Sequence, residues 1–193
     1  MKTTQHISYT QRLSGVQWKR FLGAQISYQW NLRRLQPGYT LDIGCGIGRN
    51  LLHLKGHGVG VDHNPHSIAM AQKMGLNAFS PEDFLERHKK HPVAFDSLLS
   101  AHVAEHMPRT QFKDLIQCYL PFLKPKGKLI LICPQQKGFR SDPTHVLYYD
   151  LTLLKSITQE LGFDVDRSYS FPFPEWMGKY FTHNEFVVLG VRH

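Results

Sequence analysis

The sequence predicts an α/β protein with a doubly wound, mostly parallel seven-stranded sheet. Short apolar segments alternate with segments of helical length between residues 39 and 133. A glycine-rich turn follows the first of these apolar segments. Such alternation is typical of βαβ units, whose right-handed crossovers leave few possible topologies. Two later strand segments have no long helix between them, which predicts an antiparallel pair at one edge of the sheet.

The helix expected first spans residues 15–35, because its apolar side chains recur at three-, four- and five-residue steps, and Pro37-Gly38 ends it. Three later helices have a residue suited to a helix start: Pro65 and Pro81 each open one, and Thr110 is the expected N-cap of a third. Strands are expected at residues 39–43, 58–62, 76–79, 95–100, 128–133, 163–170 and 185–191. Helices are expected between them at residues 47–54, 65–74, 81–89, 110–123 and 151–161.

The chain has 193 residues, the usual size of one α/β domain. We therefore expect a single domain over residues 1–193, with a helical extension at 1–36 and the core at 37–193. Hydrophobic residues make up 41% and charged residues 20%, which excludes a largely disordered chain. Three cysteines without a CxxC pair, no signal-peptide pattern and no apolar stretch of membrane-spanning length predict a cytoplasmic protein.

The net charge of +8 is unevenly distributed along the chain, because no acidic residue precedes Asp42. The basic residues of this first segment are Lys2, Arg12, Lys19, Arg20, Arg33 and Arg34. One interpretation is a solvated basic helix. The other is a surface that attracts an anionic substrate, such as a nucleic acid, a nucleotide-sugar or a phospholipid-linked glycan.

The most informative motif is the turn after the first strand, where Gly44, Gly46 and Gly48 alternate with other residues. Alternate glycines allow the backbone to approach a ligand closely and to turn into the next helix. Asp62 ends the following strand, where doubly wound folds place an acid against the ribose hydroxyls of an adenosine cofactor.

The spacing of these glycines separates two classes of cofactor. Dinucleotide-binding enzymes use GxGxxG around a pyrophosphate, whereas here the third glycine comes one residue sooner. Asp42 ends the strand, and its carboxylate would repel a pyrophosphate but can meet an ammonium group. The pattern therefore predicts S-adenosylmethionine as the cofactor.

At these residues the chain resembles the class I S-adenosylmethionine-dependent methyltransferases, and the likeness covers residues 38–133. The resemblance implies the Rossmann-like methyltransferase fold, with an antiparallel strand near residues 186–191. Residues 41–48 resemble the first sequence motif of this family, residues 60–62 resemble the second, and residues 95–102 resemble the fourth. Ser80 stands where an aspartate is frequent in the family. The expected cofactor-binding residues are Asp42, Gly44, Cys45, Gly46, Gly48, Asp62, His63, Ser80, Pro81 and Glu82.

A second polar group, His102-Val103-Ala104-Glu105-His106, follows the fourth strand. A helical turn beginning after His102 would place His102, Glu105 and His106 on one face. His145, in Asp142-Pro143-Thr144-His145, follows the fifth strand and could reach the same end of the sheet. The group resembles the ExxEH signature, with a later histidine, of small-RNA 3′-terminal 2′-O-methyltransferases, and it is also similar to ubiquinone-pathway O-methyltransferases. His102 stands where the first glutamate is found.

Three interpretations of this group stay open. Glu105 and His106 could simply pack a short turn. His102 or His106 could be a general base that removes a proton from a substrate hydroxyl. His102, Glu105, His106 and His145 could instead bind a divalent metal that orients and acidifies the hydroxyl.

The segment 170–185 is a long loop rich in proline and aromatic residues, which line a substrate cleft or staple the loop to the sheet. We predict an O-methyltransferase of a small molecule such as a sugar, a quinone or another secondary metabolite, with His102 and His106 facing the acceptor. One alternative is an RNA 2′-O-methyltransferase with a metal-assisted HxxEH site. Another is a cofactor-binding interaction module without catalysis.

Overall fold

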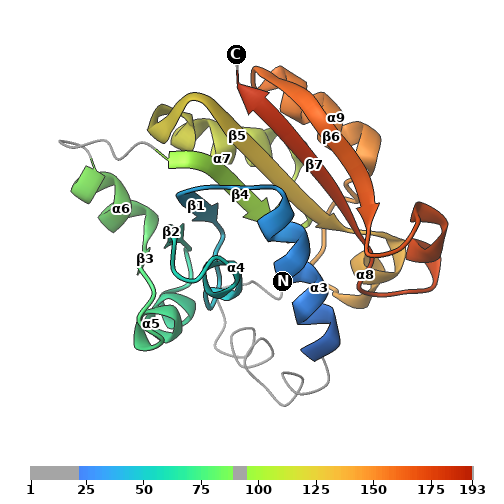
Figure 1. The fold of residues 1–193 in the computed structure, drawn as a ribbon, viewed down its shortest axis with the longest axis horizontal. Helices are drawn as coiled ribbons and strands as arrows, with labels where there is room; N and C mark the ends of the chain where they lie inside the picture. The colour runs from blue at the N-terminus through green and yellow to red at the C-terminus, as the bar shows by residue number, and fades with distance from the viewer. Residues whose placement is uncertain (1–21, 89–94, 193) are drawn as a thin grey trace. The chain divides into compact units, whose positions relative to one another are not determined.

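A computed structural model describes residues 22–88 and 95–192 of the chain (Figure 1). The chain divides into two compact units, Met1–Val93 and Ala94–His193, and each is described by itself. No helix within the described ranges is both long and apolar enough to cross a membrane.

The first unit has three parallel strands in the order β3-β2-β1. Its elements are α3 (Leu22–Arg34), β1 (Thr40–Ile43), α4 (Arg49–His53), β2 (Gly58–Val61), α5 (Pro65–Lys73), β3 (Ala78–Phe79) and α6 (Pro81–His88). Every residue of β1 and β2 is buried, as expected for parallel strands covered on both faces. Leu51, Ile68, Ala71 and Leu76 bring α4, α5 and the approach to β3 into one apolar cluster.

Side-chain caps fix where two helices of this unit begin. Asn64 Oδ1 accepts hydrogen bonds from the backbone N–H groups of His66 (3.0 Å) and Ser67 (3.3 Å), and Pro65 is the first residue of α5. Ser80 Oγ accepts from the backbone N–H of Asp83 at 3.0 Å at the start of α6. The two helices thus begin at Pro65 and Pro81, as predicted from the sequence.

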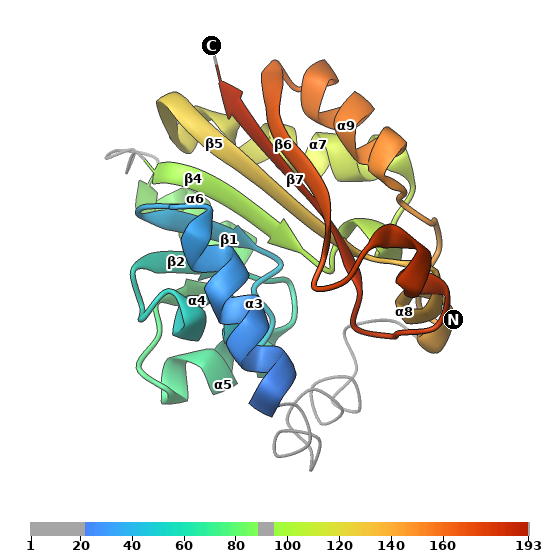
Figure 2. The ribbon, with the colours of Figure 1, turned by 45° about the vertical axis from the view of Figure 1, so that its right-hand side comes forward.

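The N-terminal helix is described only as α3, so the predicted residues 15–21 and the basic residues Lys2, Arg12, Lys19 and Arg20 lie outside the described part of the chain. α3 lies beside α4, and Arg33 Nε donates to the carbonyl of His53 at 3.0 Å (Figure 2). The Arg34 guanidinium lies 4.8 Å above the ring of Trp30, which is largely exposed.

The second unit has four strands in the order β4-β5-β7-β6. Its strands are β4 (Phe95–Ala101), β5 (Leu123–Pro134), β6 (Phe163–Phe171) and β7 (Glu185–Arg192), and its α-helices are α7 (Arg109–Tyr119), α8 (Gln136–Ser141) and α9 (Leu151–Glu160). Short 3-10 turns are η1 (Ala104–His106), η2 (Leu120–Phe122) and η3 (Glu175–Lys179). β4 and β5 are parallel, and β7 is antiparallel to both β5 and β6. The predicted antiparallel pair at one edge is therefore present, with β6 outermost and β7 inside it.

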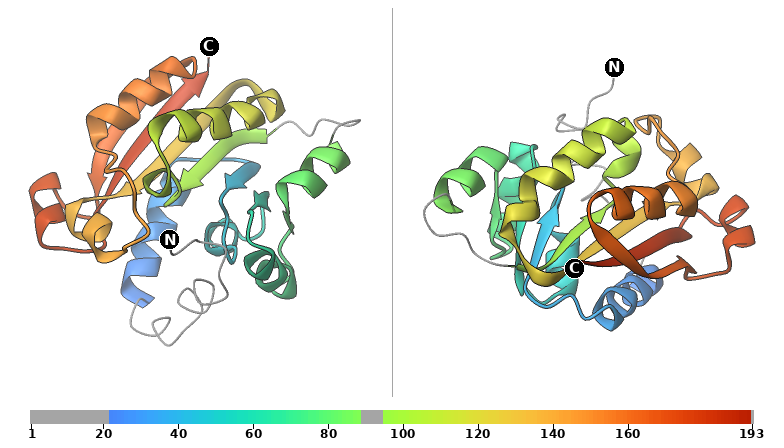
Figure 3. Two further views of the ribbon diagram at one scale, coloured as in Figure 1. Left: turned by 180° about the vertical axis from the view of Figure 1, so that it is seen from behind. Right: turned by 90° about the horizontal axis from the view of Figure 1, so that it is seen from above.

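α7 and α9 cover the same face of this four-stranded part (Figure 3). Phe112 and Ile116 on α7 are buried, as are Leu154 and Ile157 on α9. Both pairs have helical spacing, so each helix buries one apolar stripe.

Three boundaries in this unit differ from those predicted. α7 is capped by Pro108, so Thr110 lies inside the helix, and the helix ends before Pro121. β5 begins at Leu123 because the predicted turn at Lys126-Gly127 is a bulge: Phe95 pairs with Leu123, whereas Ser97 pairs with Lys128. α8 was not predicted. The seven strands, with their parallel and antiparallel pairings, are those of the predicted fold class.

Candidate functional site

The glycine turn after β1 is held to the end of β2. Gly44, Gly46 and Gly48 have φ values of 77°, 52° and 85°, a region that favours glycine. The backbone N–H groups of Gly44 and Cys45 donate to the carbonyl of Val61 at 2.8 and 3.1 Å. The first part of the turn is therefore bonded to the end of β2, and the chain then enters α4 at Gly48.

Asp62 faces this turn, as the sequence predicted. Its Oδ2 atom accepts a hydrogen bond from the Gly46 N–H at 2.8 Å, and its Oδ1 atom accepts one from the Asn64 N–H at 2.8 Å. The residue is 8% exposed. A carboxylate has about four acceptor positions, so Asp62 can still accept hydrogen bonds from two ribose hydroxyls.

Asp42 is fully buried beneath the same turn. Its Oδ1 atom accepts from Asn50 Nδ2 at 3.3 Å, whereas its Oδ2 atom accepts no hydrogen bond from the described residues. Burial raises the pKa of Asp42 to about 7, against the hydrogen bond from Asn50, and the nearby Asp62 carboxylate adds to the rise. A donor group or a cation brought to Oδ2 would satisfy this atom and favour the ionised form.

The remaining predicted cofactor residues differ in their surroundings. The Cys45 side chain is buried against Gly60, where an added Cβ would lie 2.6 Å from the Cys45 sulfur, so close packing requires glycine in β2. His63 is exposed, with Nδ1 3.7 Å from Asp62 Oδ1. Ser80 is the cap of α6 and also donates to Asp83 at 2.9 Å, while Pro81 opens the helix and Glu82 is exposed.

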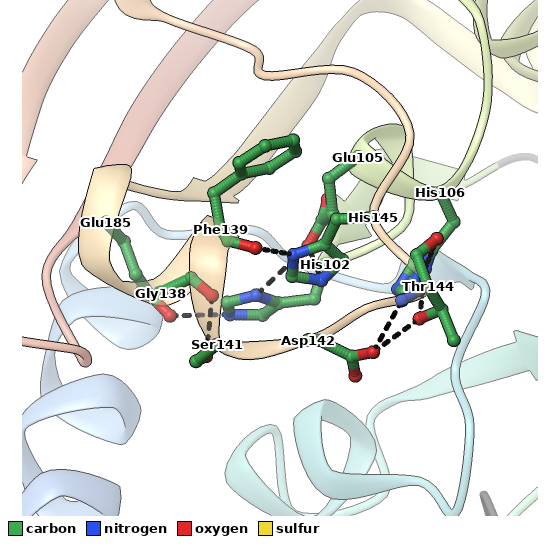
Figure 4. Close-up of polar contacts among 10 residues, drawn as sticks. All are labelled: His102, Glu105, His106, Gly138, Phe139, Ser141, Asp142, Thr144, His145 and Glu185. Atoms are coloured by element: carbon green, nitrogen blue, oxygen red, sulfur yellow. Dashed lines mark hydrogen bonds and ion pairs between the residues drawn. The ribbon is translucent and has the colours of Figure 1, made fainter.

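In the second unit, His102 directly follows β4 in a left-handed backbone conformation, with φ of 59°. The helical turn expected to begin after His102 is present as the 3-10 turn η1, and His102 precedes it. Its Nε2 atom lies 2.6 Å from Glu185 Oε1, and its Nδ1 atom lies 3.4 Å from Glu105 Oε1 (Figure 4). Burial opposes protonation, but Glu185 and Glu105 outweigh it and raise the pKa of His102 to about 10. His102 is thus an imidazolium between two carboxylates at neutral pH, which does not suit a general base.

His106 and His145 lie together although 39 positions separate them in the chain. Backbone N–H groups of Val146 and Leu147 donate to the Glu105 carbonyl at 2.6 and 3.3 Å, which joins η1 to the segment after α8. The two rings meet edge to face, with centroids 4.8 Å apart. The sequence predicted this meeting of His145 with the HxxEH group.

His106 has the opposite protonation preference to His102. Burial lowers the pKa of His106, Glu105 opposes that change, and His145 adds to it. The imidazole of His106 is therefore neutral at pH 7, when its two nitrogens have different roles.

Sequence reasoning missed Glu185, Asn50 and Thr144. Glu185 opens β7, and its proximity to His102 depends on the antiparallel pairing of Glu185 with Pro134 in β5. No spacing in the sequence reveals such a long-range pair. Asn50 could have been noticed, because it lies in the first helical turn after the glycine motif.

The aromatic segment 170–185 is anchored by a buried polar network, and its exposed aromatic side chains include Trp176 and Tyr180. Asn184 Nδ2 donates to Gln135 Oε1 at 3.2 Å and to Ser170 Oγ at 3.0 Å. Trp176 and Tyr180 are 64% and 75% exposed. These two aromatic side chains are therefore not core residues of the described structure.

In the first unit, a glycine turn after one strand and an acid directly after the next strand are typical of an α/β enzyme with an adenosyl cofactor. The second unit has the histidine–glutamate group, which consists of His102, Glu105, His106 and His145, after β4 and β5. A family model described as "Methyltransferase domain" matches residues 16–168. The chain belongs to this methyltransferase family, which confirms the resemblance to class I S-adenosylmethionine-dependent methyltransferases and the predicted enzyme class.

Solved structures confirm the predicted fold class. The chain is similar to a SAM-dependent methyltransferase from Archaeoglobus fulgidus, at 22% identity and a TM-score of 0.68 over 90% of this chain and 97% of that chain. It is also similar to magnesium protoporphyrin IX methyltransferase (ChlM) from Synechocystis PCC 6803 with bound SAM, at 15% identity and a TM-score of 0.68 over 98% and 93%. No curated protein sequence matches the chain.

Proposed function

We propose that the protein is an S-adenosylmethionine-dependent O-methyltransferase of a small molecule. The observation that carries the proposal is the joint placement of Asp62 and Asp42 at one glycine turn. Asp62 accepts a hydrogen bond from Gly46 in the turn, and Asp42 Oδ2 accepts none from any residue that the structure describes.

The residues of the first unit fit this cofactor. Asp62 would accept hydrogen bonds from the ribose hydroxyls, while Asp42 would interact, directly or through water, with the ammonium group of the methionine part. Gly44, Gly46 and Gly48 let the backbone approach the ligand. His63, Ser80, Pro81 and Glu82 would lie around the adenosine, and Cys45 would contribute backbone only, because its side chain is packed inside. The bound sulfonium supplies an activated methyl group, so the protein has to align the acceptor and manage one proton.

The histidine–glutamate group is the proposed acceptor side. It follows the carboxyl end of β4, and ligands of open α/β sheets bind at the carboxyl ends of strands. In the form without a bound ion, His106 is the neutral imidazole that can accept a hydroxyl proton. His102 is a positioning group, held between Glu105 and Glu185.

One observation supports a small acceptor, and another supports a cytoplasmic location of the protein. Solved structures similar to this chain include methyltransferases named for magnesium protoporphyrin IX and plantazolicin. Cys45, Cys118 and Cys133 are free thiols, which suits a reducing compartment.

The proposal is tested by incubating the purified protein with radiolabelled S-adenosylmethionine and a panel of hydroxylated quinones, sugars and phenols. We expect transfer to a hydroxyl and a loss of about 10²–10⁴-fold in kcat for His106→Ala. His66→Ala, which removes an exposed histidine on α5, should retain full activity. Cofactor binding without turnover on any acceptor would instead indicate a non-catalytic module. Transfer only to RNA ends would replace the small-molecule acceptor.

A further inference from the structure

Three side chains of the second unit converge around one point: Glu105 and His106 from η1, and His145 from the segment after α8 (Figure 4). One ligand atom from each of them lies within 4.8 Å of the other two. Small side-chain rotations would bring all three atoms to the distances at which a metal ion is bound.

The hydrogen bonds of the two histidines fix their tautomers. His145 Nδ1 lies 2.7 Å from the carbonyl of Phe139, which can only accept, so this nitrogen carries the proton. Thr144 Oγ1 donates to Asp142 Oδ1 at 2.7 Å and therefore accepts from His106 Nδ1 at 3.1 Å. Nε2 is then the lone-pair nitrogen of both rings. A partner on the outer nitrogen is the usual device that orients a metal-binding histidine.

Glu105 supplies the charge for such a site. It is 1% exposed, and among the described residues neither carboxylate oxygen has a hydrogen bond of ordinary geometry, although the His102 ring and the Cys133 thiol lie beside it. Two ring nitrogens lie near its Oε1 atom: His102 Nδ1 at 3.4 Å and His145 Nε2 at 4.0 Å. A buried carboxylate is costly unless a cation or several donors satisfy it. Part of that requirement is met by the contact with the His102 ring, whose Nε2 atom lies 2.6 Å from Glu185 Oε1.

We infer that Glu105, His106 and His145 bind one divalent transition-metal ion through a carboxylate oxygen and the two Nε2 atoms. Two imidazoles and one carboxylate suit Zn²⁺, Co²⁺ or Mn²⁺ better than Mg²⁺, which prefers oxygen ligands. His102 is not a ligand, because Glu185 occupies its Nε2 atom. The four-residue set predicted from the sequence is thereby reduced to three.

Three protein ligands leave coordination positions for water or for an oxygen of the acceptor. This consequence rests on the proposed function, whereas metal binding itself does not. With the ion bound, His106 would be a ligand instead of a proton acceptor. The ion would lower the pKa of a coordinated acceptor hydroxyl, whose proton would pass to bulk water.

The test uses the tag-free full chain, treated with a chelator and titrated with Co²⁺ while the visible absorption is recorded. Zn²⁺ is titrated in parallel by calorimetry. We expect one ion per chain and a cobalt spectrum with nitrogen ligands, and no binding of Mg²⁺ at the same concentrations. His145→Gln and Glu105→Gln should abolish the spectrum, and Thr144→Val should weaken affinity by about 10–100-fold through the lost support of His106. His66→Gln is the matched control and should bind the ion normally.

Absence of a one-to-one cobalt complex, or equal binding by His145→Gln, Thr144→Val and the parent protein, would overturn the inference. Circular dichroism of each variant separates loss of ligands from loss of fold. Calorimetry with S-adenosylmethionine on the metal-free protein separates this result from the proposed function. Binding of S-adenosylmethionine without binding of a metal ion would contradict only the metal site. Binding of a metal ion without binding of S-adenosylmethionine would contradict only the proposed cofactor site.

Discussion

At the scale of single residues, Asp42 is the group whose protonation state matters most for the account. Its pKa in the folded chain, about 7, is above the ordinary value of 3.8. The folded state therefore binds a proton more tightly than the unfolded state does between these pH values. The stability of the ligand-free chain should fall as pH rises from about 4 to 7, and Asp42→Asn should flatten this part of the profile.

The same shift predicts that S-adenosylmethionine binding releases a proton. An ammonium group near Asp42 Oδ2 favours the carboxylate form of Asp42. Because the pKa of Asp42 is about 7, the affinity for S-adenosylmethionine should increase as the pH rises from 6 to 7. Calorimetry in buffers with different heats of ionisation measures the released proton directly. Asp42→Asn should bind more weakly and without dependence on the buffer. An unchanged heat in all buffers for the parent protein would show that Asp42 does not meet the ammonium group.

Individual residues also show where the sequence was sufficient. The pairing of Asp62 with the glycine turn follows from local order along the chain, because both flank adjacent parallel strands. The pairing of His102 with Glu185 needs β7 beside β5, which is a property of the folded sheet. The protonation states of the two histidines also depend on the folded sheet. The sequence predicted His102 and His106 equally as bases, and only their neighbours in the structure give their pKa values opposite shifts.

At the scale of elements, the start of α5 couples helix stability to the cofactor site. Asn64 caps the helix through its side chain, and its backbone N–H holds Asp62 Oδ1. Asp150 caps α9 in the second unit by accepting from the Leu153 N–H at 2.8 Å. The two caps are chemically alike, but only Asn64 contacts a proposed cofactor residue.

We expect Asn64→Ala and Asp150→Ala each to lower the free energy of unfolding by about 1 kcal/mol, measured by urea denaturation. Asn64→Ala should also weaken S-adenosylmethionine binding, because Asp62 loses the geometry of its support. Asp150→Ala should leave that affinity unchanged. Equal affinities in both variants would show that the cap does not position Asp62.

Regular periodicity predicted the existence of the strands and of the long helices correctly, and local geometry decided the exceptions. Lys126, with φ of 58°, and Gly127 make a bulge that keeps β5 paired on either side, so a turn signal was present without a turn. α8 is only six residues long and carries no extended apolar stripe, and therefore gave no periodic signal.

At the scale of the whole molecule, the family match over residues 16–168 includes parts of both compact units. This supports our proposal of one methyltransferase domain over residues 1–193. The fold class was predictable because seven strand segments occur in a recognisable order. The acceptor was not, since the same fold supports many substrates and specificity depends on the side chains around the site.

The central claim is that the glycine turn and Asp62 hold an adenosyl group, and isothermal titration of the purified chain with S-adenosylmethionine tests it most directly. We predict one binding site per chain and an increase in Kd of at least about tenfold for Asp62→Ala, since one charge-assisted hydrogen bond contributes about 1.5–3 kcal/mol. Asp114→Ala, which removes an exposed carboxylate on α7, should bind like the parent protein. No binding by the parent chain, or the same Kd in a folded Asp62→Ala variant, would contradict the account.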